Sequence, residues 1–121
     1  MKNLLLVLLA GVFLVSCEPS GVVCTQEFRS VIVFNAGLPL TKTYTLDNTN
    51  GDTVAKYDIW VDDTYVVVSD LEMNRIGTNQ TRQFTFYGER NGNIVCQEVY
   101  TISTDRCHIT KVSGADTLLC P

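Results

Sequence analysis

Residues 82–103 read RQFTFYGERNGNIVCQEVYTIS, and this stretch decides the fold. Asn91-Gly92 is the strongest hairpin signal in the chain, because both residues tolerate the positive φ angles of a two-residue turn. Phe84 and Phe86 lie in phase before that turn, as alternate residues of a strand with one buried face do. The pattern predicts two antiparallel strands, residues 82–88 and 94–103, joined at Asn91-Gly92.

Residues 40–46 carry the cleanest alternation in the chain. Leu40, Tyr44 and Leu46 fall on one face, and threonines fall on the other. Alternation of this kind is typical of a half-buried strand.

The remaining segments also read as short strands separated by turns. Residues 54–61 and 64–69 flank Asp62-Asp63 and are expected to form a hairpin, while residues 70–81 are irregular and have room for one helical turn. The predicted strands are residues 26–35, 40–46, 54–61, 64–69, 82–88, 94–103 and 107–112. Short strands at this spacing predict an all-β fold, a Greek-key β-sandwich of about seven strands.

The N-terminus reads as an export signal that is cleaved. Lys2 precedes an apolar run from Leu4 to Val15, which is shorter than the roughly 20 residues of a membrane-spanning helix and fits the apolar region of a secretory signal. The run ends in Leu14-Val15-Ser16-Cys17, which resembles the lipobox of bacterial lipoproteins. This resemblance implies cleavage before Cys17, acyl chains on that cysteine, and, because Glu18 is not an aspartate, an outer-membrane or cell-surface location.

The chain therefore divides into a signal peptide (1–16), a lipidated tether (17–23) and one β-sandwich domain (24–121). From Cys17 onward it has 8 basic and 13 acidic residues, and the basic ones are scattered singly. Scattered cations argue against a nucleic-acid partner, which needs grouped positive charge. The expected partners are a membrane, through the acyl chains on Cys17, and a protein or glycan.

Four cysteines follow Cys17, and an even number in a small exported domain predicts two disulfides. They are Cys24, Cys96, Cys107 and Cys120. The absence of a Cys-x-x-Cys pair and the single histidine argue against a zinc site. No cofactor or metal is expected.

Three segments carry a second resemblance: YVVVSD at 65–70, FTFYG at 84–88 and DRCHITKVSG at 105–114. They resemble the later strands of small bacterial surface lipoproteins, whose domains are similar to carboxypeptidase-regulatory (prealbumin-like) and immunoglobulin-like sandwiches. The resemblance implies a fold and no activity. In such sandwiches the first strand often runs parallel to the last, which implies the pair Cys24–Cys107. A hairpin about Thr104-Asp105 would place Cys96 near Ser113, and the tail after Gly114 would then bring Cys120 to Cys96. A hairpin about Ser113-Gly114 would instead place Cys107 opposite Cys120, so both arrangements stay open.

No catalytic constellation stands out from the residues. His108 is expected to be a strand residue with a local hydrogen bond, because no Ser-His-Asp or Cys-His arrangement can be assembled around it. Asp62-Asp63 is expected to be solvated at a hairpin tip. Residues 48–52 place oxygen ligands at alternate positions, and a plain turn is expected there. Together with Asp47, Asp58, Asp62 and Asp63 they leave weak calcium binding as the alternative.

The aromatic residues offer one candidate binding surface. Trp60 is out of phase with its neighbours and would lie across from Tyr65 if Asp62-Asp63 is the turn. An exposed pair of this kind could stack on a sugar or a partner protein. The alternative places Trp60 in the core.

Three functions remain after these exclusions. The first is a non-enzymatic binding or accessory domain, lipid-anchored at the envelope, with an unknown ligand. The second is a structural or stress-related envelope component without a discrete ligand, and the third is a hydrolase or protease inhibitor. A sandwich fold alone does not choose among them.

Overall fold

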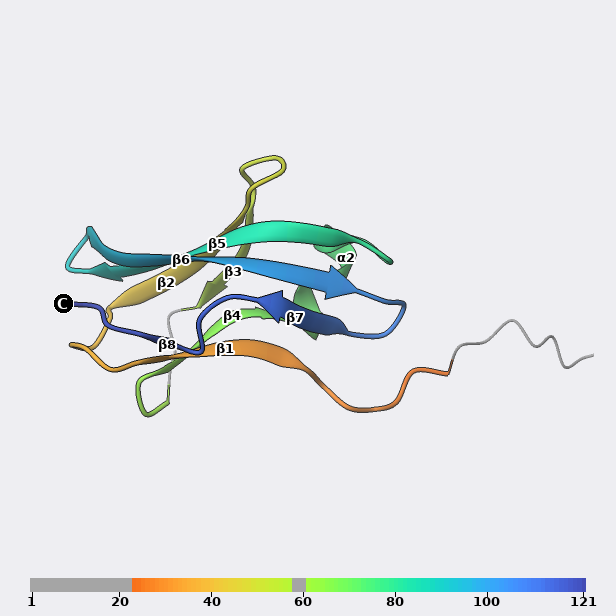
Figure 1. Ribbon diagram of the computed structural model, residues 1–121, viewed down its shortest axis with the longest axis horizontal. Helices are drawn as coiled ribbons and strands as arrows, with labels where there is room; N and C mark the ends of the chain where they lie inside the picture. The colour runs from red at the N-terminus through yellow and green to blue at the C-terminus, as the bar shows by residue number, and fades with distance from the viewer. Residues whose placement is uncertain (1–22, 58–60) are drawn as a thin grey trace, which may run out of the picture.

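The computed structural model describes residues 23–57 and 61–121, so the predicted signal peptide, Cys17, Asp58 and Trp60 lie outside the described residues. Two β-sheets pack face to face, and the C-terminus lies at one end of the sandwich (Figure 1). The described residues form eight strands: β1 (Ser30–Asn35), β2 (Lys42–Asp47), β3 (Thr53–Tyr57), β4 (Thr64–Ser69), β5 (Thr81–Arg90), β6 (Asn93–Thr104), β7 (Ile109–Ser113) and β8 (Thr117–Leu118).

The predicted all-β, two-sheet architecture is confirmed. One sheet has five strands in the order β3-β2-β5-β6-β7, and the other has three in the order β4-β1-β8. The short strand β8 did not belong to the predicted set, and it runs parallel to β1 through the pairs Phe34↔Thr117 and Asn35↔Leu118.

The hairpin predicted from residues 82–103 is the longest ladder of the molecule. β5 and β6 pair antiparallel from Thr81↔Ser103 to Arg90↔Asn93. Asn91 (φ 53°) and Gly92 (φ 82°) form the two-residue turn in the left-handed region that these residue types tolerate. Phe84 and Phe86 are fully buried, so the predicted phase is also correct.

Strand β2 is half-buried as expected, but its threonine face is the buried one. Thr45 pairs with Phe86 and Asp47 pairs with Phe84, and directly paired residues share a face of a sheet. The buried phenylalanines therefore bring Thr43, Thr45 and Asp47 inside. The polar groups find partners there: the Thr45 hydroxyl donates to the Val67 carbonyl of the opposite sheet at 2.6 Å, and Asp47 accepts from the Arg82 guanidinium at 2.9 Å.

The hairpin predicted between residues 54–61 and 64–69 is wrong. Asp62 (φ 50°) and Asp63 (φ 56°) do form a tight turn, which the Thr64 N–H closes on the Val61 carbonyl at 3.0 Å. However, Val61↔Thr64 is an isolated bridge, because β3 pairs with β2 and β4 pairs with β1. The chain thus passes from one sheet to the other between the end of β3 and the start of β4.

The predicted helical turn exists between β4 and β5. A 3-10 turn, η2 (Asp70–Glu72), leads into the short helix α2 (Met73–Ile76). Ser69 caps it, with its side chain accepting from the Leu71 N–H while Glu72 accepts from the Ser69 N–H at 2.7 Å. The Tyr57 hydroxyl donates to the same Glu72 at 2.8 Å, and burial is the main cause that raises the pKa of Tyr57 to about 12.

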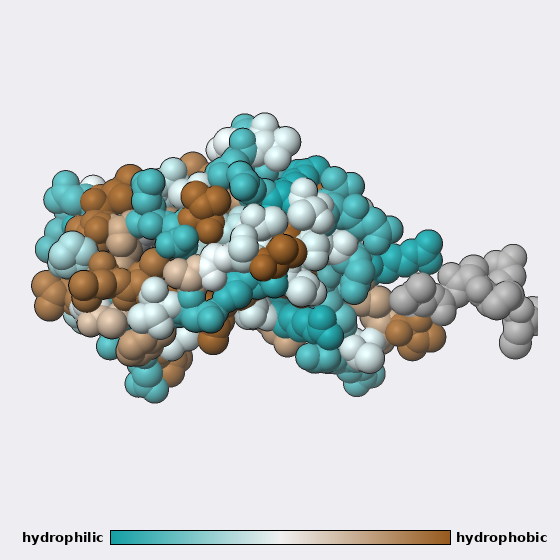
Figure 2. Space-filling model, in the orientation of Figure 1, coloured by the Kyte–Doolittle hydropathy of each residue, from teal (hydrophilic) through white to brown (hydrophobic). Residues whose placement is uncertain are grey.

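The core fills the space between the sheets. Its largest fully buried side chains come from both sheets and from the loops at their ends: Tyr65, Tyr100, Phe84, Phe86, Leu40, Ile76, Ile102 and Ile109. Exposed apolar side chains gather at the end of the sandwich that carries the C-terminus (Figure 2), where Leu38, Ile94 and Leu119 are 60 %, 52 % and 73 % exposed.

Candidate functional site

An open groove of about 480 Å³ separates the edges of β1 and β7. We call it the β1–β7 groove; it is lined by residues 27–32, which lead into and form the start of β1, by residues 109–111 of β7, and by Asp116. Its floor is apolar, because Val31 and Ile109 are 6 % and 2 % exposed, whereas Ile32 at its mouth is 50 % exposed. The groove therefore lies where the β1 edge of one sheet approaches the β7 edge of the other.

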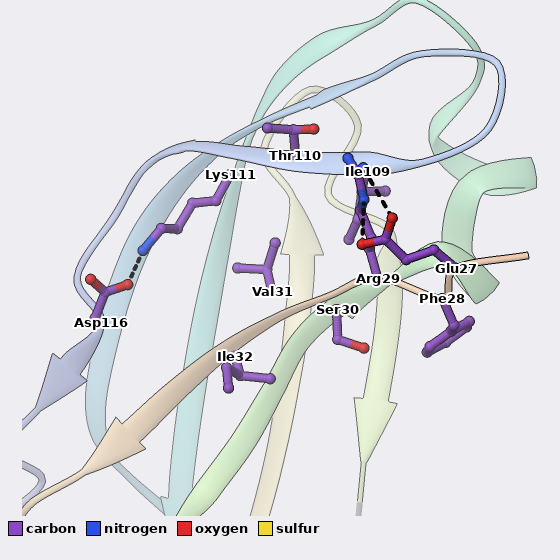
Figure 3. Close-up of a pocket in the computed structure, with 10 residues that line it drawn as sticks. All are labelled: Glu27, Phe28, Arg29, Ser30, Val31, Ile32, Ile109, Thr110, Lys111 and Asp116. Atoms are coloured by element: carbon purple, nitrogen blue, oxygen red, sulfur yellow. Dashed lines mark hydrogen bonds and ion pairs between the residues drawn. The ribbon is translucent and has the colours of Figure 1, made fainter. Parts of the chain in front are cut away.

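Two ion pairs flank the β1–β7 groove (Figure 3). Arg29 pairs with Glu27 at 3.4 Å on one side, and Lys111 pairs with Asp116 on the other. Between them the close-up shows Ser30, Val31 and Ile32 without a charged side chain over them. The groove therefore has charged ends and an uncharged middle.

A hydrogen-bonded cluster lies next to this groove and includes the single histidine. His108 Nδ1 lies 2.7 Å from Asp70 Oδ2, and His108 Nε2 lies 3.0 Å from the Thr25 hydroxyl. A hydroxyl, an imidazole and a carboxylate in this order have the arrangement of a nucleophilic triad, which the residue pattern did not predict because Thr25, Asp70 and His108 are far apart in the chain.

The contacts of Asp70 show what the cluster holds together. Its carboxylate accepts from the Arg29 N–H and the Ile109 N–H, both at 2.9 Å, and so joins the start of β1 to the start of β7. Burial acts to raise the pKa of Asp70, but the hydrogen bonds from His108 and from these two N–H groups outweigh it and hold the pKa below its usual range.

The two disulfides are those of the first predicted arrangement. Cys24 bonds to Cys107 and Cys96 bonds to Cys120, each with a Cα–Cα distance of 5.2 Å. The expected route differs in detail, because Thr101 and not Cys96 pairs with Ser113. The turn between β6 and β7 is longer than two residues, and it is the tail beyond β8 that brings Cys120 to Cys96.

The outer face of the five-stranded sheet carries an aromatic pair that the residue pattern did not single out. Tyr44 and Tyr87 stack with ring centroids 5.1 Å apart and an interplanar angle of 20°. Tyr44 also pairs with Lys56 of β3, and Tyr87 pairs with Gln97 of β6. Paired residues share a face, so these four side chains form one row across four strands, which we call the tyrosine row.

The candidate surface expected at Trp60 and Tyr65 does not hold for Tyr65. Tyr65 is 2 % exposed, and its hydroxyl oxygen accepts from the Leu40 N–H at 3.0 Å inside the core. The phase of Phe84 and Phe86 would have placed Tyr87 on the outer face. Only the pairing of β2 with β5 places Tyr44 beside it.

No group of three metal-ligating acidic, histidine or cysteine side chains occurs within residues 23–57 and 61–121. Asp47, which precedes the loop at residues 48–52, is buried against Arg82 and accepts from the Thr49 N–H at 2.8 Å. Asp63 lies at the turn between the sheets, where its carbonyl accepts from the Asn35 N–H. The loop at residues 48–52 is therefore held by its own turn hydrogen bonds.

No protein-family model matches the sequence, and no match was found among curated proteins or solved structures. Of the residues described, none belongs to a helix long and apolar enough to cross a membrane. The described chain is thus defined as a small all-β domain of two packed sheets with two disulfides, which indicate an exported domain.

Proposed function

We propose that the chain is a lipid-anchored envelope protein whose sandwich binds a carbohydrate without chemically changing it. The observation that carries this proposal is the tyrosine row: two stacked aromatic rings on an outer sheet face, with polar side chains at both ends. Aromatic faces bind the apolar side of a sugar ring, and neighbouring polar groups bind its hydroxyls.

The dimensions and chemistry of the tyrosine row fit a short oligosaccharide. Four adjacent strands at about 4.8 Å spacing give the row a length of about 14 Å. Lys56 and Gln97 are exposed, and within the described chain no ion pair or hydrogen bond occupies either side chain. Lys42 lies 5.7 Å from the centre of the Tyr44 ring and pairs with Glu89 at 3.6 Å, which supports the aromatic pair from one side.

A glycan array tests this proposal, with the purified domain and its Tyr44→Ala and Tyr87→Ala variants. We expect wild-type binding to at least one glycan class and a loss of at least tenfold in each variant, because each removes one ring of the stacked pair against which the sugar would lie. Val112→Ala is the matched control, since Val112 is 60 % exposed on the same sheet and outside the row. Absence of glycan binding, or binding that survives both substitutions, overturns the proposal.

The membrane anchor is tested separately. We expect Cys17→Ala to move the protein from the membrane fraction to the soluble fraction, because that cysteine would carry the acyl chains. Retention of the variant in the membrane fraction contradicts the anchor and leaves the glycan-binding test unaffected.

Hydrolysis of an ester or amide is a second candidate function, favoured by the Thr25–His108–Asp70 cluster. A hydroxyl-reactive fluorophosphonate should then label Thr25, and Thr25→Val should abolish labelling. The lining of the β1–β7 groove includes neither Thr25 nor His108. The carboxylate of Asp70 is also occupied by two backbone N–H groups. Both facts favour the binding function.

A further inference from the structure

Strand β8 covers only the second half of β1. The Phe34 N–H donates to the Asp116 carbonyl at 2.9 Å, and the Ala36 N–H donates to the Leu118 carbonyl at 2.8 Å, both on the β8 side. The Asn35 N–H points the other way, to Asp63. Ladder pairing of β1 with β8 is confined to Phe34 and Asn35.

The first half of β1 therefore has a free edge. Successive backbone amides of a strand point to opposite sides, so the N–H and C=O groups of Ser30 and Ile32 point to the same side as the Phe34 N–H. Among residues 23–57 and 61–121, no strand lies on that side at Ser30 and Ile32. These main-chain groups face the β1–β7 groove.

The groove gives this edge the other features of a strand-binding site. At about 3.3 Å per residue, the free edge from Ser30 to Val33 is about 13 Å long. A strand laid along it would place alternate side chains over buried Val31 and Ile109 and the others in solvent. The two flanking ion pairs (Figure 3) leave Val31 and Ile32 without a charged side chain over them.

We propose that the free edge of β1 binds an extended peptide segment of a partner protein by strand addition. The peptide occupies the β1–β7 groove in line with β8 and extends the three-stranded sheet. Backbone hydrogen bonds to Ser30 and Ile32 supply the attachment, and small apolar residues at alternate positions of the peptide fill the groove. This site is separate from the tyrosine row and does not depend on it.

The test uses acetylated and amidated KTVTVTVK as the probe peptide, followed by ¹⁵N amide shifts and hydrogen exchange of the full domain. In the free protein, we expect the amides of Ser30 and Ile32 to exchange rapidly and those of Val31 and Val33 to be protected. Saturating peptide should then protect Ser30 and Ile32 and shift the resonances of residues 28–33 and 109–111.

Two alternately N-methylated versions of the peptide are the matched controls. A strand bonds to an edge through every second residue, so one methylated version should bind like the parent and the other should not bind. The proposal is overturned if the parent peptide gives no shifts at millimolar concentration, or if both methylated versions bind equally. Protection of Ser30 and Ile32 in the free domain also overturns it, because the edge is then already covered by the chain itself or by a second copy.

Discussion

Each end of the sandwich is held together by one disulfide and by one side chain that forms hydrogen bonds with several backbone groups. At the end where β1 begins, Cys24–Cys107 lies beside Asp70, which accepts from two backbone N–H groups and from His108. At the end that carries the C-terminus, Cys96–Cys120 lies beside Asn35. The two closures differ in charge and in burial.

At the C-terminal end the closure belongs to the core. Cys120 is fully buried and Asn35 is 2 % exposed. The Asn35 amide donates to the Leu38 carbonyl at 2.7 Å and accepts from the N–H groups of Gly37 and Cys120. Arg90 adds hydrogen bonds to the carbonyls of Leu38 and Pro121. A neutral amide suits this place, because an unpaired charge would be costly to bury.

At the other end the closure holds a segment against the outside of the domain. Cys24 and Thr25 are exposed, and the hub is a carboxylate whose hydrogen bonds keep it ionised. One disulfide therefore belongs to the core, whereas the other fastens an exposed segment to the domain.

The largest effect is expected from the double substitution of Cys96 and Cys120 by alanine. The 24-residue separation gives a loop-entropy contribution of about 3.5 kcal/mol, and loss of the buried Cys120 sulfur adds about 1 kcal/mol. We expect the free energy of unfolding to fall by about 4–5 kcal/mol in urea denaturation. A loss under about 2 kcal/mol would show that this end does not depend on its disulfide.

Removal of Cys24–Cys107 by serine substitution should cost less, although its loop is longer. The separation of 83 residues gives about 4.5 kcal/mol by loop entropy. Without this disulfide, the segment before Arg29 can detach while the core stays folded, and the folded state then gains conformational entropy as well. We therefore expect the free energy of unfolding to fall by only about 2–3 kcal/mol. If this variant is less stable than the Cys96/Cys120 variant in the same urea titration, the length of the closed loop, and not burial, determines which disulfide stabilises the domain more.

Asp70→Asn is expected to cost about 1–2 kcal/mol at pH 7, because charge-assisted hydrogen bonds weaken. The folded-state pKa of Asp70 lies below its unfolded value. Its contribution is therefore complete above the unfolded pKa of about 4 and is lost as pH falls through the folded pKa. Unfolding free energies of wild type and variant, measured from pH 7 down to pH 3, should converge at the acid end.

Asn35→Asp is the matched control for that experiment at the C-terminal end. The ionised carboxylate would lie against the Leu38 carbonyl, to which the Asn35 amide donates in the wild type, whereas a protonated carboxyl can donate to it. This variant should therefore be destabilised at pH 7 and recover stability as pH falls. If the difference in unfolding free energy from wild type does not change with pH in either variant, the two ends do not differ in the charge of their central residue. That result would contradict the roles given to Asp70 and Asn35.

The smallest effect is expected from Thr25→Val, which keeps the side-chain shape and removes the hydroxyl bonded to His108. Because Thr25 is exposed, water can replace the lost hydrogen bond, and the cost should be under about 1 kcal/mol. Thermal unfolding of wild type and variant measures it. A cost as large as that of Asp70→Asn would mean that the hydroxyl, and not the carboxylate, holds this end together.

The sequence predicted the parts of the fold that local chemistry specifies. Asn91-Gly92 determined a two-residue turn, and Phe84 and Phe86 determined which face of β5 is buried. The even number of cysteines after Cys17 indicated disulfides and export. The sequence did not determine which face of β2 is buried, because its threonines alternate as regularly as its apolar residues. Threonines can also lie inside when their hydroxyls have hydrogen-bond partners.

The candidate sites depend on residues that meet only in three dimensions. Thr25, Asp70 and His108 come from three separate segments, and the tyrosine row needs the register of four strands. The free edge of β1 exists because β8 is only two residues long and pairs only with Phe34 and Asn35. No local sequence pattern predicts where such pairing between two strands ends.

Strands, turns and the phase of the central hairpin are predictable from local sequence, since they follow from backbone preferences and the two-residue period of a strand. Only the tertiary structure decided which strands share a sheet, which face of β2 is buried and where a strand edge stays open. The physical reason is that side-chain period fixes what alternates along one strand, whereas register and sheet membership depend on contacts between segments that are distant in the chain.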